Sequence, residues 1–471
     1  MLTAQEYYRD PEVQERIAEY CGGSAQEPEL CTAEYLVGYG EALIGNLAPE
    51  PDVSTPKKGF HYILDSGLDI FRSLWDRVHT LGVLDVEYFN LDRPGAVYLD
   101  QVGVFKKIEP VYRAILDVYG RYGIQPLVLM TGQGYHFSFQ IQSGTKTDLM
   151  LEGMGNLIDS LEGKYRVNLS KRHRHVSLRH GRSFDGMGRV MEFLAHEVIK
   201  AAAAATPLPV MLTDVAIGRL KEGEREAISV DLSCFGDPIY MRDIRCAFST
   251  HQKHKVQRYK VGDAIADGTP IQIAIPRGKL SLNECMAMRR HFRNCAEYAK
   301  STYCFIPDYS VNFKKVVEEY KASKLHRFHQ WFDSEKQDPW SVWDKTYRAF
   351  DMRVLPPCVQ HSLRIPNDNL LKPTNLQTLT RCLLALGWHP QHIAGLVRSK
   401  WEGNYGWGPD RWAHFDAGSR SSFYVRLFSG LMAAGVDRLL DHNCVSHLEK
   451  GFCWQPNCGY SLGMYHWNGK F

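Results

Sequence analysis

The sequence predicts an α+β protein in which a mixed or antiparallel sheet with flanking helices is followed by a mainly helical C-terminal part. Apolar residues alternate over 83–89 and over a strand, glycine turn and strand at 126–142, which predicts the sheet. Apolar residues at helical spacing over 374–386, 389–400 and 421–434 predict the C-terminal helices. We expect an N-terminal helical segment and linker (1–58), a domain built on the sheet (59–276), a helical connector (277–350) and a helical C-terminal domain (351–471).

The composition is that of an ordinary globular protein. The 471 residues are 44% hydrophobic and 23% charged, which suits two or three domains with their own cores. No apolar run lies in residues 1–19 and no segment reaches the roughly 20 apolar residues that cross a bilayer, so we expect a cytoplasmic protein without membrane contact. A net charge of +3 does not by itself indicate nucleic acid, and twelve cysteines without an export signal indicate reduced thiols, some of them metal ligands.

The remaining elements follow from the spacing of apolar residues and from glycine and proline. We expect helices at 13–20, 33–47, 66–79, 106–121, 187–205, 284–300 and 311–331, and a linker over 49–58.

Two carboxylates stand on the first predicted strand. Asp85 and Glu87 are two residues apart, so both point to the same face of the strand. Adjacent anions on a buried face repel each other, and a divalent cation between them would make the arrangement favourable. The alternative is that the pair marks the solvent face of an edge strand.

A glycine turn follows between the next two strands. Gly132 and Gly134 allow a sharp turn that brings backbone amides close to a ligand, Thr131 opens the turn, and His136 stands where the return strand leaves it. An ordinary hairpin turn is the alternative.

Two basic stretches could contact phosphates. Lys171, Arg172 and Arg174 belong to a run without acidic residues, which is either a solvated loop or a nucleic-acid contact. Further on, a strand carrying Asp231 precedes a basic stretch with hydroxyl groups that suits a polyphosphate; the alternative is a solvated loop. This stretch contains Arg245, Ser249, His251 and Lys253.

Three cysteines lie close together near the end of the chain. Cys444, Cys453 and Cys458 are flanked by glycine and proline and can fold around one metal centre, with Cys358 as a fourth thiolate. A structural zinc site that uses His442 or His447, or three buried thiols without metal, are the alternatives.

The order of these motifs over residues 60–276 resembles the archaeo-eukaryotic primase superfamily, the primase-polymerases. The resemblance implies that Asp85, Glu87 and Asp231 are catalytic and bind two Mg²⁺ or Mn²⁺ ions. Asp237 is a rival to Asp231 for the third carboxylate. The resemblance also implies a nucleotide site. That site would contain Thr131, Gly134, His136, Arg245, Ser249, His251 and Lys253. Many family members carry a serine two positions before the histidine, where this chain has Gly134.

The C-terminal part is similar to the iron-sulfur domain of the large primase subunit, since a Pro-Pro-Cys, a helical bundle and a late cysteine cluster occur in that order. This similarity implies a [4Fe-4S] cluster on Cys358, Cys444, Cys453 and Cys458, with Zn²⁺ as the alternative.

Together the two resemblances imply a DNA primase-polymerase that makes and extends primers on a single-stranded DNA template from nucleoside triphosphates, with a replicative helicase as a candidate partner. A metal-dependent nuclease and an inactive module that binds single-stranded nucleic acid are the alternative functions.

Overall fold

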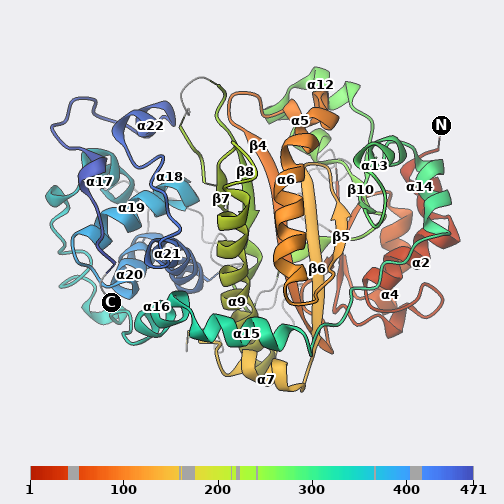
Figure 1. Cartoon of the computed structure of the whole chain (residues 1–471), viewed down its shortest axis with the longest axis horizontal. Helices are drawn as coiled ribbons and strands as arrows, with labels where there is room; N and C mark the ends of the chain where they lie inside the picture. The colour runs from red at the N-terminus through yellow and green to blue at the C-terminus, as the bar shows by residue number, and fades with distance from the viewer. Residues whose placement is uncertain are drawn as a thin grey trace.

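The computed structural model describes residues 2–40, 52–158, 161, 176–213, 215–218, 223–239, 242–364, 368–403 and 416–469. A mixed six-stranded sheet stands at its centre, with the N-terminal helices on one side and the C-terminal helical region on the other (Figure 1). The predicted α+β class is confirmed in this form. Among the described helices, none combines the length and the apolar character needed to cross a bilayer.

The central sheet has the strand order β12-β5-β6-β4-β8-β7. Its long strand β4 runs antiparallel to β6 on one side and to β8 on the other, and β7 is parallel to β8. Four of the predicted strands therefore exist and are neighbours, as β5, β6, β4 and β8, and β12 and β7 extend the sheet at its edges. The strands are β4 (His79–Asn90), β5 (Leu127–Met130), β6 (Gly134–Gln142), β7 (Val210–Leu212), β8 (Glu226–Asp231) and β12 (Ile275–Pro276).

A second, four-stranded sheet has the order β2-β1-β3-β9, and β10 pairs with β11. Three predictions are wrong here. Strands β1 and β3 occupy described parts of the expected helices 33–47 and 66–79, and β2 and the first turn of helix α4 lie in the expected linker 49–58. Gly67 adopts a φ of 69°, which ends helix α4 and lets the chain enter β3. The strands are β1 (Leu36–Tyr39), β2 (Asp52–Ser54), β3 (Asp69–Ser73), β9 (Asp243–Arg245), β10 (Thr250–His251) and β11 (Gln272–Ile273).

Helices α6 and α9 cover one face of the central sheet, as Figure 1 shows. Val86 of β4 lies opposite Tyr135 of β6 and Val230 of β8, and the Tyr135 ring meets Phe105 of α6 edge-on. Residues one position away, including Asp85, therefore face away from these helices. The helices of this half are α1 (Ala4–Tyr8), α2 (Pro11–Tyr20), α4 (Pro56–Asp65), α5 (Ala96–Leu99), α6 (Gln101–Gly120), α7 (Lys146–Glu152), α9 (Leu178–Ala202), α10 (Lys253–Val256), α11 (Arg258–Val261) and α12 (Asp263–Gly268).

The connector and the C-terminal region are helical, as expected. The predicted helices 284–300 and 311–331 are each interrupted, the second where Ser323 caps the helix that follows it. The helices are α13 (Leu282–Met288), α14 (Phe292–Ala299), α15 (Phe313–Ala322), α16 (Lys324–Asp333), α17 (Pro357–Arg364), α18 (Asp368–Leu371), α19 (Pro373–Ala385), α20 (Pro390–Trp401), α21 (Ala417–Ala433) and α22 (Cys444–Glu449). Single 3₁₀ turns occur at Pro28–Leu30, Ser233–Phe235, Trp340–Val342, Met352–Val354 and Leu462–Met464.

The C-terminal region is joined to helix α9 by buried charges. Arg426 of α21 lies 3.4 Å from Asp185 and 3.6 Å from Glu192, both on α9. Arg189 of α9 binds Asp333 at the end of α16 at 2.7 Å. Removing one partner of such a buried pair costs about 3–5 kcal/mol, so the two halves depend on each other for stability.

Candidate active site

One row of side chains crosses three neighbouring strands on the face away from α6 and α9. Asp85 of β4 lies directly opposite His136 of β6 on one side and Asp231 of β8 on the other. The His136 Nε2 atom is 3.4 Å from an Asp85 carboxylate oxygen. Glu87 is two residues further along β4 and shares this face. The backbone register alone thus brings the three predicted catalytic carboxylates and the predicted histidine together.

This row forms one wall of a cavity of about 380 Å³ between the two sheets. The opposite wall comes from β1, β3 and β9 and from the start of α10. The lining includes Tyr39, Asp69, Phe71, Asp85, Glu87, Thr131, His136, Asp231, Ser233, Arg242, Asp243, Arg245, His251, Lys253 and Gln257. Eight of the ten residues predicted to be catalytic or to bind nucleotide are in this set. The volume suits a nucleotide-sized ligand.

Glu87 is compensated by a lysine from the opposite wall. Lys253 Nζ donates to both carboxylate oxygens of Glu87 at 3.2 Å. Burial raises the pKa of Glu87, but the charge and hydrogen bond of Lys253, together with the charges of His136 and Arg245, lower it by more in sum, so the net pKa is lowered. Glu87 is therefore ionised at neutral pH, and Lys253 stands where it could exchange this carboxylate for a phosphate.

Arg245 is held in place by an acidic residue that the sequence did not indicate. Its guanidinium lies 2.8 Å from an oxygen of Asp69, bonds to the Thr250 carbonyl and covers the Phe71 ring at 4.5 Å. Only 7% of Arg245 is exposed. An arginine fixed on three sides presents its remaining N–H groups in one direction, which suits recognition of an anion in the cavity.

The two cavity histidines are neutral. Burial lowers the pKa of His136 to about 4. Glu87 acts to raise this pKa, whereas Arg245 and Lys253 lower it further. Burial also lowers the pKa of His251 well below its usual value, again with help from Arg245 and Lys253. The Nδ1 atoms of both rings and the hydroxyl of Thr131 are buried without a hydrogen-bond partner among the described residues. These polar atoms are available to a ligand.

Asp231 is oriented by two hydroxyl groups. Thr213 Oγ1 donates to one carboxylate oxygen at 2.8 Å, and Ser233 donates to both through its backbone N–H and its hydroxyl, at 2.9 and 2.6 Å. Arg242 in turn donates to Ser233 Oγ at 2.8 Å. Thr213 has a φ of 55°, which is rare for a β-branched residue and typical of strain kept at functional sites.

Three residues considered for the site have other roles. Ser249 does not line the cavity, because its fully buried hydroxyl accepts from the Ile70 N–H at 2.7 Å and donates to the Thr250 carbonyl at 3.0 Å. Gly134 is also absent from the lining. A Cβ atom there would lie 1.7 Å from the Val86 carbonyl oxygen, so the glycine permits strand pairing. The rival carboxylate Asp237 accepts from the Asp416 N–H at 3.2 Å and joins the two halves.

Four polar residues that hold the predicted side chains in position were missed. Asp69 fell within a wrongly predicted helix, although Gly67 before it could have indicated a break. Thr213, Ser233 and Arg242 lie on short segments beside β7, β8 and β9, and no sequence motif connects them. Among these three, only Ser233 could have been predicted from local sequence, since a serine two residues after an aspartate commonly donates a hydrogen bond back to it.

The four predicted iron-sulfur ligands approach one another at the far end of the C-terminal region. Cys358 lies on α17, Cys444 begins α22, and the half-buried Cys453 and Cys458 lie on the loop that follows. Burial, and then the nearby thiols of Cys453, Cys444 and Cys458, raise the pKa of Cys358 to about 12. The rival ligand His442 bonds through Nε2 to the Tyr465 carbonyl at 3.3 Å, and His447 is buried against Phe452.

Within the described residues, no three side chains of His, Cys, Asp or Glu are arranged closely enough to hold a single ion. The predicted nucleic-acid contacts Lys171, Arg172 and Arg174 lie outside the described residues. Comparison with protein-family models, with curated proteins and with solved structures gave no match.

Proposed function

We propose that this protein is a primase-polymerase: it adds nucleotides to a primer on a single-stranded DNA template and also starts such primers. The observation that carries the proposal is the position of Asp85, Glu87 and Asp231 on one wall of a cavity whose other residues are suited to a triphosphate. The resemblance of the motifs supports the same reading.

The carboxylates fit hard divalent cations. Asp85 and Asp231 are direct cross-strand neighbours, and like charges in such positions destabilise a sheet. His136 is neutral and Lys253 binds Glu87, so neither cancels this repulsion. Asp85, Glu87 and Asp231 offer only oxygen ligands, the kind that Mg²⁺ and Mn²⁺ prefer. When bound there, such ions would neutralise charge on the phosphates and lower the pKa of the attacking hydroxyl.

The chain's own residues would position the nucleotide. Arg245, already braced by Asp69, would bind a phosphate through its free edge, and Lys253 would move from Glu87 to the triphosphate. Neutral His136 can hydrogen-bond a phosphate or sugar oxygen without adding charge. Alignment of this kind is most of what phosphoryl transfer needs from a protein.

The cysteine arrangement suits a metal centre, which the resemblance implies is an iron-sulfur cluster. Four thiolates around one zinc ion lie about 3.8 Å apart, given Zn–S bonds of about 2.3 Å. Cys453, Cys444 and Cys458 lie near enough to Cys358 for their thiols to raise its pKa. A four-iron cluster is larger and holds its thiolates further apart. Cys358, Cys444, Cys453 and Cys458 would hold it, and the cluster would fasten α17 to the end of the chain.

The test is incubation of the full chain with a labelled single-stranded DNA template, nucleoside triphosphates and Mn²⁺, with and without a primer. We expect longer products in both reactions. A shortened template would show a nuclease instead, and an unchanged template bound by the protein would show a binding module. Either result overturns the proposal. Asp117→Asn, an exposed substitution on α6, serves as the matched control for Asp85→Asn.

A further inference from the structure

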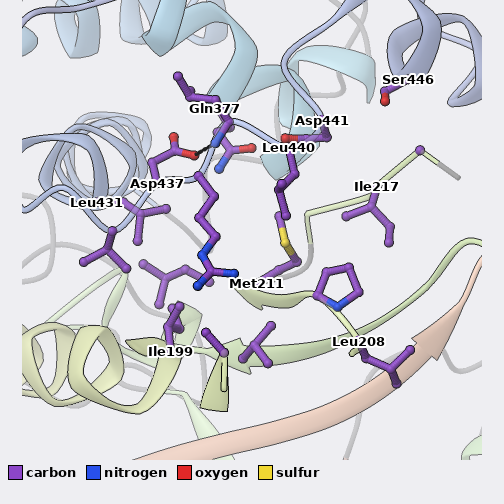
Figure 2. A pocket seen from close by; sticks show the side chains of 18 of the residues that line it. Ile199, Leu208, Met211, Ile217, Gln377, Leu431, Asp437, Leu440, Asp441 and Ser446 are labelled. Atoms are coloured by element: carbon purple, nitrogen blue, oxygen red, sulfur yellow. Dashed lines mark hydrogen bonds between the residues drawn. The ribbon is translucent and has the colours of Figure 1, made fainter. Parts of the chain in front are cut away.

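A second cavity, of about 270 Å³, lies where the edge of the central sheet meets the C-terminal helices. Figure 2 shows Ile199, Leu208 and Met211 on the side of the sheet and Gln377, Leu431 and Leu440 on the other side. None of the residues assigned to nucleotide addition lines it. Cavities at the junction of two parts of a protein are common places for small ligands.

The buried charges in and behind its wall compensate one another. Arg381 binds Asp437 at 2.7 Å and Asp441 at 3.1 Å, and Lys450 binds Asp441 at 2.9 Å. Two cations and two anions thus form a closed network, to which a charged ligand would add little. The deep part of the cavity therefore suits a neutral group with an apolar surface.

One polar atom in the wall is unsatisfied. Gln377 is only 2% exposed, and its Oε1 atom has no hydrogen-bond partner among the described residues. A buried carbonyl left in this state costs about 1–3 kcal/mol, so a ligand that donates an N–H to it would be favoured. A carboxamide can also donate, and therefore pairs well with a group that has an amino donor beside a ring acceptor.

These features together select an adenine nucleotide. Adenine has an amino donor next to a ring nitrogen. It is also the nucleobase without a carbonyl oxygen, and the aliphatic walls would leave such an oxygen of another base unpaired. The volume is near the lower limit for small-molecule sites, which suits one base and not a dinucleotide. Arg438 also lines the cavity and is an exposed residue, so it could supply a guanidinium that receives a phosphate.

We propose that this junction cavity, the cavity of Figure 2, binds an adenine nucleotide, with the base against Gln377 and the phosphate at Arg438.

Calorimetric titration of the full chain with AMP, without divalent cations, tests the site. We expect one AMP per chain with a Kd below about 1 mM. Gln377→Leu should weaken binding at least about tenfold while keeping the fold, because it replaces an unpaired buried amide with an apolar group of similar size. GMP should bind at least about tenfold more weakly than AMP, since its carbonyl oxygen would be left unpaired.

Two arginines allow a matched comparison. Arg438→Ala should weaken AMP but leave adenosine unchanged, whereas Arg293→Ala, an exposed substitution on the distant helix α14, should change neither. Lys253→Ala should leave AMP binding intact, because it affects only the catalytic cavity. Absence of binding at about 10 mM AMP, equal binding of AMP and GMP, or full binding by Gln377→Leu would overturn the proposal.

The position of the cavity also suggests what its occupant does; this step rests on the proposed function. Strand β7 lines the cavity, and the next residue, Thr213, holds Asp231. A ligand that fixes β7 should therefore change the rate of primer extension by at least about twofold in the natural chain but not in Gln377→Leu. If AMP binds and the rate stays constant in an extending enzyme, the coupling is refuted. If no extension occurs at all, the proposed function has failed and AMP binding still decides the site.

Discussion

The sheet site and the cysteine site differ in what holds them together. Asp85, His136 and Asp231 are placed by the hydrogen bonds of three adjacent strands, and hydroxyl groups and Lys253 already engage the carboxylates. The four cysteines instead lie on α17, on α22 and on the loop after it. The sheet site should therefore keep its geometry without any ligand, whereas the end of the chain should depend on its metal centre for order.

The largest effect should come from the carboxylates. Asp85→Asn or Asp231→Asn should reduce nucleotide addition on the order of 10³-fold, because each removes charge where cations and phosphates meet. The unfolding midpoint of Asp85→Asn should not fall, since this change relieves a repulsion between direct neighbours, whereas Asp231→Asn also disturbs the hydrogen bonds that Asp231 accepts from Thr213 and Ser233. Steady-state extension assays and urea unfolding measure the two effects. A loss below about threefold in both variants would contradict the role of the cavity.

The next prediction concerns Glu192, which lies on α9 where this helix meets the C-terminal helices. Burial raises its pKa to about 7, although the charges of Arg426 and His196 act to lower it. Such a carboxyl contributes stability that is complete below pH 4.5 and lost as the pH rises to about 7. As the pH rises from 5 to 8, the free energy of unfolding of Glu192→Gln should therefore increase relative to that of the wild type, by about 3 kcal/mol at most. Urea unfolding at several pH values measures this, and a difference independent of pH would contradict it.

The cysteine site should be separable from the sheet site. Cys453→Ser should remove the visible absorption of anaerobically purified protein and loosen residues 444–464, measured by hydrogen exchange. Primer initiation should fall at least about tenfold while extension changes less than about threefold. Cys295→Ala on α14 is the control. Deletion of 351–471 is a poorer test, because it would strand Asp185 and Glu192 without Arg426. Equal loss of initiation and extension in Cys453→Ser would show that the cysteine site is not functionally separable from the sheet site.

The smallest effect should come from Lys253. Lys253→Ala should raise the nucleotide KM about tenfold with a smaller change in kcat, because it removes one charge-assisted contact. It should also raise the pKa of Glu87, since burial would then act unopposed by that lysine. Lys260→Ala, an exposed change nearby in sequence, should have neither effect. An unchanged KM would assign Lys253 to holding Glu87 alone.

Sequence reasoning succeeded where a rule of local geometry applied. Alternation along a strand placed Asp85 and Glu87 on one face, and helical spacing found α6, α19, α20 and α21. It failed for β3, since Leu68, Phe71, Trp75 and Val78 mimic the spacing of a helix face.

Strand register was beyond the sequence, because alternation does not tell which residue lies opposite which. For that reason the pairs of Asp231 with Thr213 and of Arg245 with Asp69 went unseen. The hydroxyl of Ser249 was assigned to phosphate by its place in a motif, whereas the backbone of β3 uses it. The approach of Cys358 to the late cysteines was likewise suggested by a resemblance and by no local pattern.

The most direct test is electron paramagnetic resonance of Mn²⁺ bound to the full chain in the presence of a non-hydrolysable nucleoside triphosphate. The account predicts two bound Mn²⁺ ions per chain in the wild type and their loss in the Asp85→Asn, Asp231→Asn double variant, with Asp117→Asn unchanged. Equal Mn²⁺ binding by the wild type and the double variant would contradict it.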